Sequence, residues 1–244
     1  MRRFVAALVL VCCASAGCAP PDDELTLFVA ASVVDLAKEW QADCARQGID
    51  FSLHSGGSLL LVHQIAAGAH ADFLLAAGRS AMELWPEEMP PARLDTSYLH
   101  NRMVVVTRPG IAPPATLAEL TDGRFDRIVV ADFELAPAGR YAKSALEQAG
   151  VWQALTSRII KTGDVRMALA AVRTGSADAG FVYATDLAAA PGLPAADFGL
   201  HDPFPPAGYP LVMLSPETPR KTALWDYLHS EPARAAARKH GFLP

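Results

Sequence analysis

The chain has few cysteines for its 244 residues, and their positions limit how the fold can be stabilised. Cys12, Cys13 and Cys18 lie close to the N-terminus, so Cys44 is the one cysteine in the body of the chain. A single thiol cannot form an internal disulfide, and the fold must therefore be held by its core. Cys44 lies on the apolar stripe of a predicted helix, where a buried and unreactive thiol is expected.

An excess of positive charge is also lacking, because the formal net charge is −5. A nucleic-acid partner requires a basic face, so none is expected. None of the 7 histidines lies in a metal-binding motif, and Ser58 has neither a G-x-S-x-G context nor a recognisable base partner. We therefore expect no cation site, no cofactor and no enzymatic activity. Binding of a small anion stays compatible with the net charge, since an anion responds to the local field of its pocket.

Long hydrophobic runs are missing except near the N-terminus. Two arginines precede the apolar run 4–13, which is typical of an export signal and too short for a stable bilayer anchor. An A-x-A cleavage pattern overlaps with a lipoprotein-like box at 15–18, in which Cys18 would be lipidated. We expect residues 1–18 to be a lipoprotein signal and the protein to be extracytoplasmic, anchored through Cys18. Ordinary cleavage after Ala16 is the alternative.

Strand-like and helix-like segments alternate along the rest of the chain. The expected strands cover residues 25–31, 49–53, 72–77, 103–107, 127–131, 179–183 and 211–214, and the expected helices cover residues 33–44, 58–67, 139–149, 164–174 and 219–240. This alternation predicts an α/β protein with mostly parallel sheets. In such sheets, ligands bind at the carboxyl ends of strands, next to helix N-termini.

Strand–helix turns made of small or hydroxyl residues recur at 30–32, 55–58 and 137–139, and the helix start at 164–165 is a fourth candidate. A helix N-terminus carries unpaired N–H groups and a partial positive charge, and small residues let an anion approach them. Serine hydroxyls would add donors without adding charge. A serine at a helix start is more often a plain N-cap, and we expect Ser32 to cap the helix that follows it. Several such turns in one cleft would bind a dianion with neutral dipoles alone.

Six segments, taken in order, resemble one protein family. They are LTLFVAASVVDLAKEW (25–40), SGGSLLLVHQIAAGAHADFLLAAG (55–78), NRMVVVT (101–107), PAGRYAKSALEQAGVW (137–152), DVRMALAAVRTGSADAGFVYATD (164–186) and HGFLP (240–244). The chain resembles the periplasmic molybdate-binding proteins of ABC importers, a branch of the type II periplasmic binding proteins. The resemblance implies two lobes with mixed, mostly parallel sheets, flanking helices and a ligand cleft between the lobes. It implies a first lobe from residues 24–102 and 208–244, and a second lobe from residues 103–207.

The resemblance also implies an oxyanion site with residues from both lobes. Members of the family hold the ligand with two serines from the first lobe and with an alanine, a valine and a tyrosine from the second. The matching positions in this sequence are Ser32, Ser58, Ala138, Val165 and Tyr183. Because alanine and valine have no polar side chain, their backbone N–H groups would be the donors.

The function implied by the resemblance is the extracytoplasmic binding component of an ABC importer. Its ligand would be molybdate and also tungstate, its partner a membrane permease, and its expected state a monomer. Molybdate is fully ionised at neutral pH and carries only acceptors, so a pocket of donors would disfavour protonated phosphate. Three alternatives stay open: binding of another oxyanion such as sulfate or thiosulfate, a secreted two-lobed α/β enzyme, and a sensor that signals to a membrane partner.

Overall fold

The computed structural model describes residues 24–198 and 207–243. The predicted signal at 1–18 and its candidate lipidation site, Cys18, therefore lie outside the described residues. Within the described part of the chain, every helix is too short or too polar to cross a membrane.

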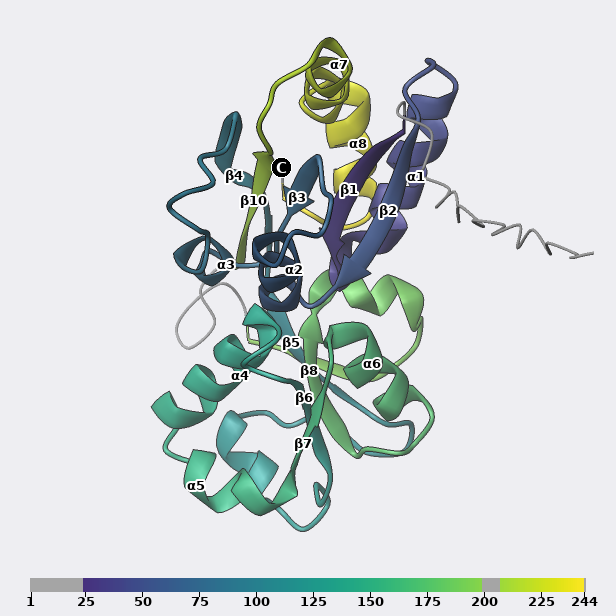
Figure 1. The fold of residues 1–244 in the computed structure, drawn as a ribbon. Helices are drawn as coiled ribbons and strands as arrows, with labels where there is room; N and C mark the ends of the chain where they lie inside the picture. Colours follow the sequence, from purple (N-terminus) through teal and green to yellow (C-terminus); the bar gives the residue numbers. More distant parts are fainter. Residues whose placement is uncertain (1–23, 199–206, 244) are drawn as a thin grey trace, which may run out of the picture.

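Five strands form the first sheet, in the order β2-β1-β3-β10-β4. Strand β1 pairs in parallel with β2 and β3, whereas β10 runs antiparallel to β3 and β4. The strands are β1 (Leu25–Ala30), β2 (Phe51–Gly56), β3 (Phe73–Leu75), β4 (Arg93–Asn101) and β10 (Ala207–Met213), and the helices beside them are α1 (Val34–Ala45), α2 (Ser58–Ala66), α3 (Ser80–Glu83), α7 (Pro219–Leu228) and α8 (Glu231–Lys239). We call this unit the first lobe; it is the upper one in Figure 1.

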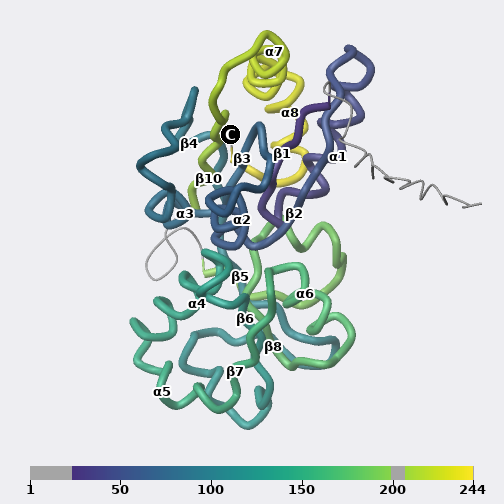
Figure 2. The backbone as a smooth tube through the Cα atoms, in the orientation of Figure 1, coloured from purple at the N-terminus to yellow at the C-terminus, as the bar shows by residue number. Residues whose placement is uncertain are grey.

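The second sheet also has five strands, in the order β7-β6-β8-β5-β9. Strand β6 is parallel to β7 and β8, whereas β5 is antiparallel to β8 and β9. The strands are β5 (Met103–Thr107), β6 (Ile128–Ala131), β7 (Ile159–Thr162), β8 (Ala179–Tyr183) and β9 (Ala195–Asp197), and the helices are α4 (Pro137–Gln148), α5 (Trp152–Leu155) and α6 (Val165–Arg173). This unit is the second lobe, which Figure 2 shows below the first along the backbone trace.

Short 3-10 helices complete the fold. They are η1 (Ala31–Val33), η2 (Leu117–Thr121), η3 (Thr156–Arg158) and η4 (Ala184–Ala189). The first of them follows β1 directly, and the fourth follows β8, so both lie at the carboxyl end of a central strand.

Each sheet is covered by helices on both faces, which explains why its central strands read as unbroken apolar runs. Along β1, Leu27 and Val29 belong to the core beneath α1 and α8, whereas Phe28 packs on the opposite face with α2. Strand β5 alternates in the same way, with Val105 facing the main core and Val104 facing α6. Successive side chains of a strand point to opposite faces, so a strand covered twice needs apolar residues at every position.

The predicted fold class is confirmed: the chain forms two mixed sheets flanked by helices. Strands β5 and β8 have the predicted bounds, and the expected segment at 219–240 is the helix pair α7 and α8. Strands β4, β7 and β9 were not predicted, because each carries polar residues at partly exposed edges of a sheet. The division into lobes near 102/103 and 207/208 stays a proposal.

One local prediction is wrong. Ser32 does not cap the following helix, because it lies inside η1 and α1 begins two residues later, with Val33 at its N-cap. The 3-10 turn leaves the Ser32 hydroxyl free of a capping bond and available to other partners.

Candidate functional site

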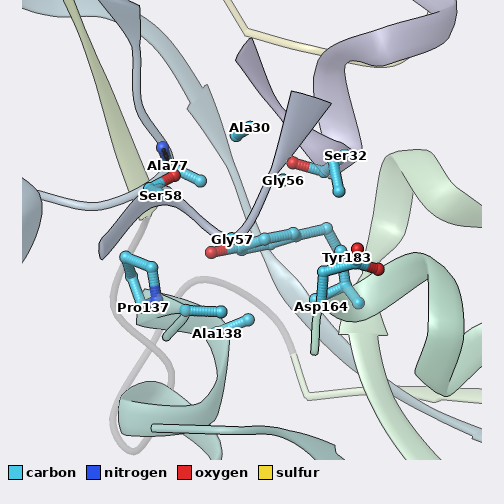
Figure 3. Close-up of a pocket in the computed structure, with 13 residues that line it drawn as sticks. Ala30, Ser32, Gly56, Gly57, Ser58, Ala77, Pro137, Ala138, Asp164 and Tyr183 are labelled. Atoms are coloured by element: carbon cyan, nitrogen blue, oxygen red, sulfur yellow. Dashed lines mark hydrogen bonds between the residues drawn. The ribbon is translucent and has the colours of Figure 1, made fainter. Parts of the chain in front are cut away.

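The five residues predicted from the resemblance surround one cavity between the lobes. Figure 3 shows Ser32 and Ser58 on one side of this cavity and Ala138 and Tyr183 on the other. The empty space measures about 210 Å³, including a part open to solvent. The lining residues are Ala30, Ala31, Ser32, Gly56, Gly57, Ser58, Ala77, Ala136, Pro137, Ala138, Asp164, Val165 and Tyr183. A cavity of this size fits a small ion better than a sugar or a peptide.

Ser58 is the first residue of α2 and is 1% exposed. Its Oγ accepts a hydrogen bond of 2.8 Å from the backbone N–H of Ala77, just beyond β3. A backbone N–H can only donate, so the Ser58 hydroxyl must direct its own proton elsewhere. The hydroxyl proton is therefore available to a ligand in the cavity that Ser58 lines.

Ser32 lies across the cavity in η1 and is 3% exposed. Its Oγ is 3.0 Å from the hydroxyl of Tyr209 in β10. Burial raises the pKa of Tyr209 above its ordinary value, so this hydroxyl keeps its proton. Two hydroxyls from distant parts of the sequence thus share one hydrogen bond at the first-lobe wall.

Two lining residues of the second lobe offer backbone donors at helix starts. Ala138 follows Pro137, which has no N–H, so Ala138 carries the first free N–H of α4. Val165 opens α6, whose N-cap Asp164 accepts hydrogen bonds from the next two N–H groups, those of Arg166 and Met167. The Val165 N–H has no partner within the helix, because the first N–H groups of a helix lack one.

Tyr183 ends β8 and is 1% exposed, yet its hydroxyl has no hydrogen-bond partner among the described residues. Burial raises the pKa of Tyr183 well above its ordinary value, which keeps the hydroxyl protonated. A buried polar group without a partner costs about 1–3 kcal/mol. Because the residue also lines the cavity, its hydroxyl is a donor that a ligand in the cavity would satisfy.

The lobes touch each other beside the cavity. The N–H groups of Leu59 and Leu60, in the first turn of α2, donate to the carbonyl of Leu135 in the second lobe at 3.0 and 3.2 Å. Gly57 makes this approach feasible, because a Cβ there would lie 2.5 Å from the Leu135 carbonyl oxygen and 3.1 Å from that of Gly163. The lobes are therefore in direct contact beside the cavity, and a glycine lies at this contact.

The cavity lining contains neither lysine nor arginine. Its one charged residue is Asp164, whose Oδ1 accepts the two N–H groups of α6 at 2.8 and 2.9 Å. An anion in this cavity would be held by N–H and O–H dipoles. Bonds from such fixed donors strengthen in a site that excludes water.

Behind the cavity, Arg166 joins carboxylates of both lobes. Its Nη2 is 2.8 Å from Asp35 in α1, and its Nε is 2.9 Å from Asp186 in η4. Asp186 is fully buried and also accepts the N–H of Tyr183 at 2.9 Å. Burial raises the pKa of Asp186 to about 7, although Arg166 and the Tyr183 N–H act in the opposite direction. Asp186 thus orients the backbone next to Tyr183.

Sequence reasoning missed three features of this site: the close approach at Gly57, the cap Asp164, and the contact of Ser32 with Tyr209. The Gly-Gly pair before Ser58 is a signal for the first, and an aspartate preceding a helical stripe is a signal for the second. Tyr209 gives no local signal, because it is 177 residues from Ser32 in sequence. Arg140, two residues after Ala138, donates through Nε to the carbonyl of Phe133.

No group of three or more His, Cys, Asp or Glu side chains within residues 24–198 and 207–243 could hold a metal ion. The candidate site is thus defined by hydrogen-bond donors around a small cavity.

Comparison with known proteins gives one family match that covers nearly all of the described chain. The model for bacterial extracellular solute-binding proteins matches residues 25–243. A Bacillus subtilis (strain 168) protein named as an ABC transporter substrate-binding lipoprotein is 31% identical, over 98% of this chain and 96% of its own length. The molybdate-binding protein ModA of Escherichia coli (strain K12) is 29% identical, over 94% of this chain and 93% of its own length.

Among solved structures, the periplasmic molybdate-binding protein of Azotobacter vinelandii superposes with a TM-score of 0.79. The match covers 91% of this chain and 99% of that chain, at 20% sequence identity. At this identity the likeness establishes the two-lobed fold and leaves the ligand to be argued from the site.

Proposed function

Because the chain belongs to the family of bacterial extracellular solute-binding proteins, we propose that it captures molybdate outside the cytoplasm for an ABC importer. Tungstate has nearly the same size and charge, so we propose it as a second ligand. The ligand would lie in the interlobe cavity, held by the hydroxyls of Ser32, Ser58 and Tyr183 and by the N–H groups of Ala138 and Val165. The names of the curated relatives support the proposal, since one of them is a molybdate-binding protein.

The observation that carries the proposal is the Tyr183 hydroxyl, which is buried without a partner against a cavity lined by other donors. An enclosed set of unused donors fits a ligand that carries only acceptors. Molybdate is such a ligand at neutral pH, because it is a fully deprotonated dianion. Hydrogenphosphate carries an O–H that would need an acceptor, and an unmet group of this kind costs about 1–3 kcal/mol.

We propose a binding role without catalysis. The family and the curated relatives are binding proteins. The partner of the loaded protein would be a membrane permease, and one copy of the chain would suffice to bind the ligand, because both walls of the cavity come from the same chain. Lipid attachment at Cys18 is part of the proposal, supported by the lipoprotein name of one relative. Intact-mass measurement of the membrane-extracted protein would detect the lipid, and a soluble product cut after Ala16 would contradict it.

Isothermal titration of the chain from about Glu24 onward tests the ligand. We expect one-to-one binding of molybdate and tungstate, with hydrogenphosphate silent and sulfate much weaker because it is the smaller ion. If sulfate displaced molybdate at equal concentration, the proposed ligand would change from molybdate to another oxyanion. Silence toward all four ions would overturn the proposed function. Turnover of a substrate that Ser32→Ala abolishes would restore the enzyme alternative.

A further inference from the structure

A chain of buried side-chain hydrogen bonds runs from the end of β4, where the chain passes from the first lobe to the second, to the cavity wall. Asn101, the last residue of β4, lies with its Nδ2 3.2 Å from the hydroxyl of Tyr209, which in turn is 3.0 Å from the Oγ of Ser32. All three side chains belong to buried residues. The inference drawn from this chain rests on the proposed function, because Ser32 would be a ligand-binding residue.

The direction of these bonds follows from one backbone contact. The N–H of Arg102 donates to the Asn101 side chain at 2.9 Å, and a backbone N–H can only donate. The atom that it meets is therefore the amide oxygen Oδ1, which leaves the Asn101 NH2 group to face its two other partners. These are the Tyr209 hydroxyl and the Oγ of Thr185 in η4, at 2.8 Å.

Either hydroxyl could donate in the Tyr209–Ser32 bond, and the Asn101 contact favours donation by Tyr209. The Tyr209 hydroxyl accepts from Asn101, and its single proton is left for the Ser32 Oγ. Ser32 accepts that proton and must send its own elsewhere, and the cavity that it lines is on its free side. We infer that Asn101 and Tyr209 are positioning residues that hold the Ser32 hydroxyl as a donor toward the ligand, and so select a fully deprotonated oxyanion over a protonated one.

The inference matters because a serine hydroxyl by itself has no fixed direction. A free hydroxyl both donates and accepts, so it could rotate to accept the O–H of hydrogenphosphate. We call the bonds from Asn101 through Tyr209 to Ser32 the relay. With the relay in place, that O–H would meet a second donor proton at Ser32. The Ser58 Oγ likewise accepts a bond from the N–H of Ala77, so in both first-lobe serines one lone pair is occupied and the proton is free to face the cavity.

The experiment compares two buried tyrosines of the first lobe. Tyr209→Phe removes the hydroxyl that donates to Ser32. Tyr98→Phe is the matched control, because Tyr98 is 5% exposed and its hydroxyl donates to the carbonyl of Leu228 at 2.6 Å, with no link to Ser32. Molybdate binding is titrated directly, and hydrogenphosphate is titrated in competition, at a mildly alkaline pH where it predominates over the singly charged form.

We expect Tyr209→Phe to lower the ratio of molybdate to hydrogenphosphate affinity about tenfold, since the released Ser32 hydroxyl becomes able to accept. The Tyr98→Phe ratio should equal that of the wild type, even if its melting temperature falls. A purely structural role for Tyr209 would weaken both ligands together and leave the ratio unchanged. That outcome would overturn the inference, as would an equal change of ratio in Tyr98→Phe.

Asn101→Asp provides a second variant if Tyr209→Phe does not fold. A carboxylate can only accept, so Tyr209 would donate to residue 101 and Ser32 would donate to Tyr209. The Ser32 hydroxyl would then present a lone pair to the cavity, and the ratio should again fall about tenfold. The added charge alone would repel both dianions alike, so an unchanged ratio in this variant contradicts the relay.

The two proposals fail in different ways. Wild-type protein that binds no oxyanion overturns the proposed function, and the relay with it. Wild-type protein that prefers molybdate, with an unchanged ratio in Tyr209→Phe and Asn101→Asp, overturns the relay alone. If the wild-type protein prefers sulfate, the ligand assignment falls, and the same ratio, measured with sulfate, still decides the relay.

Discussion

The two walls of the cavity present donors of different kinds. On the first-lobe side, the candidate donors are the side-chain hydroxyls of Ser32 and Ser58. On the second-lobe side, two of the three candidates are backbone N–H groups, at Ala138 and Val165, and the third is the Tyr183 hydroxyl. One wall is thus built mainly from side chains, and the other mainly from helix starts.

The difference shows where orientation comes from. A backbone N–H at a helix start points along the helix axis, so its direction is a property of the local fold. A hydroxyl rotates freely, and its direction depends on neighbours such as Ala77 and Tyr209, which come from other strands. The backbone donors of the second lobe are therefore insensitive to most side-chain changes, whereas the hydroxyl donors of the first lobe depend on residues behind them.

Bringing the two walls together depends on Gly57, where we expect the largest effect. In Gly57→Ala, the new Cβ would meet the carbonyl oxygens of Leu135 and Gly163, both in the second lobe, so the lobes could not make this contact. We expect a loss of about 3 kcal/mol in molybdate binding, more than a hundredfold in Kd by isothermal titration.

The same substitution should leave the melting temperature of the unliganded protein nearly unchanged, because the clash lies between the lobes and not inside one. Gly123→Ala is the control, since a Cβ there has nothing within 4 Å. Undiminished affinity in Gly57→Ala would show that the ligand does not need this contact between the lobes.

A backbone donor can be tested alone at Val165. Proline is favoured at the first position of a helix, where its missing N–H is not needed by the helix. The preceding Asp164 has φ −157° and ψ 178°, an extended conformation that a following proline tolerates. Val165→Pro should therefore keep the fold and weaken molybdate binding by about 2 kcal/mol, roughly thirtyfold in Kd.

Val165→Ala is the matched control for this donor, because it shortens the same side chain and keeps the N–H. It should bind molybdate nearly as well as the wild-type protein. If both variants lost affinity equally, the Val165 side chain would be the contributor, and the contrast between the two walls would not hold.

The groups behind the two walls differ as well. Neutral Asn101 and Tyr209 lie behind Ser32, whereas the ionisable Asp186 lies next to Tyr183. The pKa of Asp186 is raised to about 7 by burial, above its ordinary value of 3.8, so the folded state holds this proton more tightly than the unfolded state. Its contribution to stability is therefore full below about pH 4 and is lost as the pH rises towards 7.

Asp186→Asn cannot titrate, yet its amide oxygen can still accept the Tyr183 N–H. Between about pH 6 and 8, wild-type stability should fall by about 1 kcal/mol more than that of Asp186→Asn, as measured by urea denaturation. Asp178→Asn is the control, because the pKa of Asp178 is shifted in the opposite direction to that of Asp186. Burial alone would raise the pKa of Asp178, but hydrogen bonds from Arg127 and Arg108 outweigh it and lower the pKa. Identical pH profiles for Asp186→Asn and the wild-type protein would contradict the raised pKa.

Much of the fold was predictable because its signals are local. Unbroken apolar runs identify β1, β5 and β8, since strands covered on both faces have no polar side. The edge strands β4, β7 and β9 escaped prediction, because their partly exposed side chains follow no clean alternation. Their place is decided by pairing with distant strands, which no short window of sequence contains.

The sequence by itself determined the fold class, the positions of five helix starts to within two residues and, through resemblance to one family, the five candidate site residues. Each of these depends on the order of residues within a segment. The tertiary structure decided that the five lie around one cavity, that Tyr183 is buried without a partner, and that Ser32 meets Tyr209. These facts could not be derived from local patterns, because the direction of a hydroxyl proton is set by hydrogen bonds between residues as far apart as positions 32 and 209.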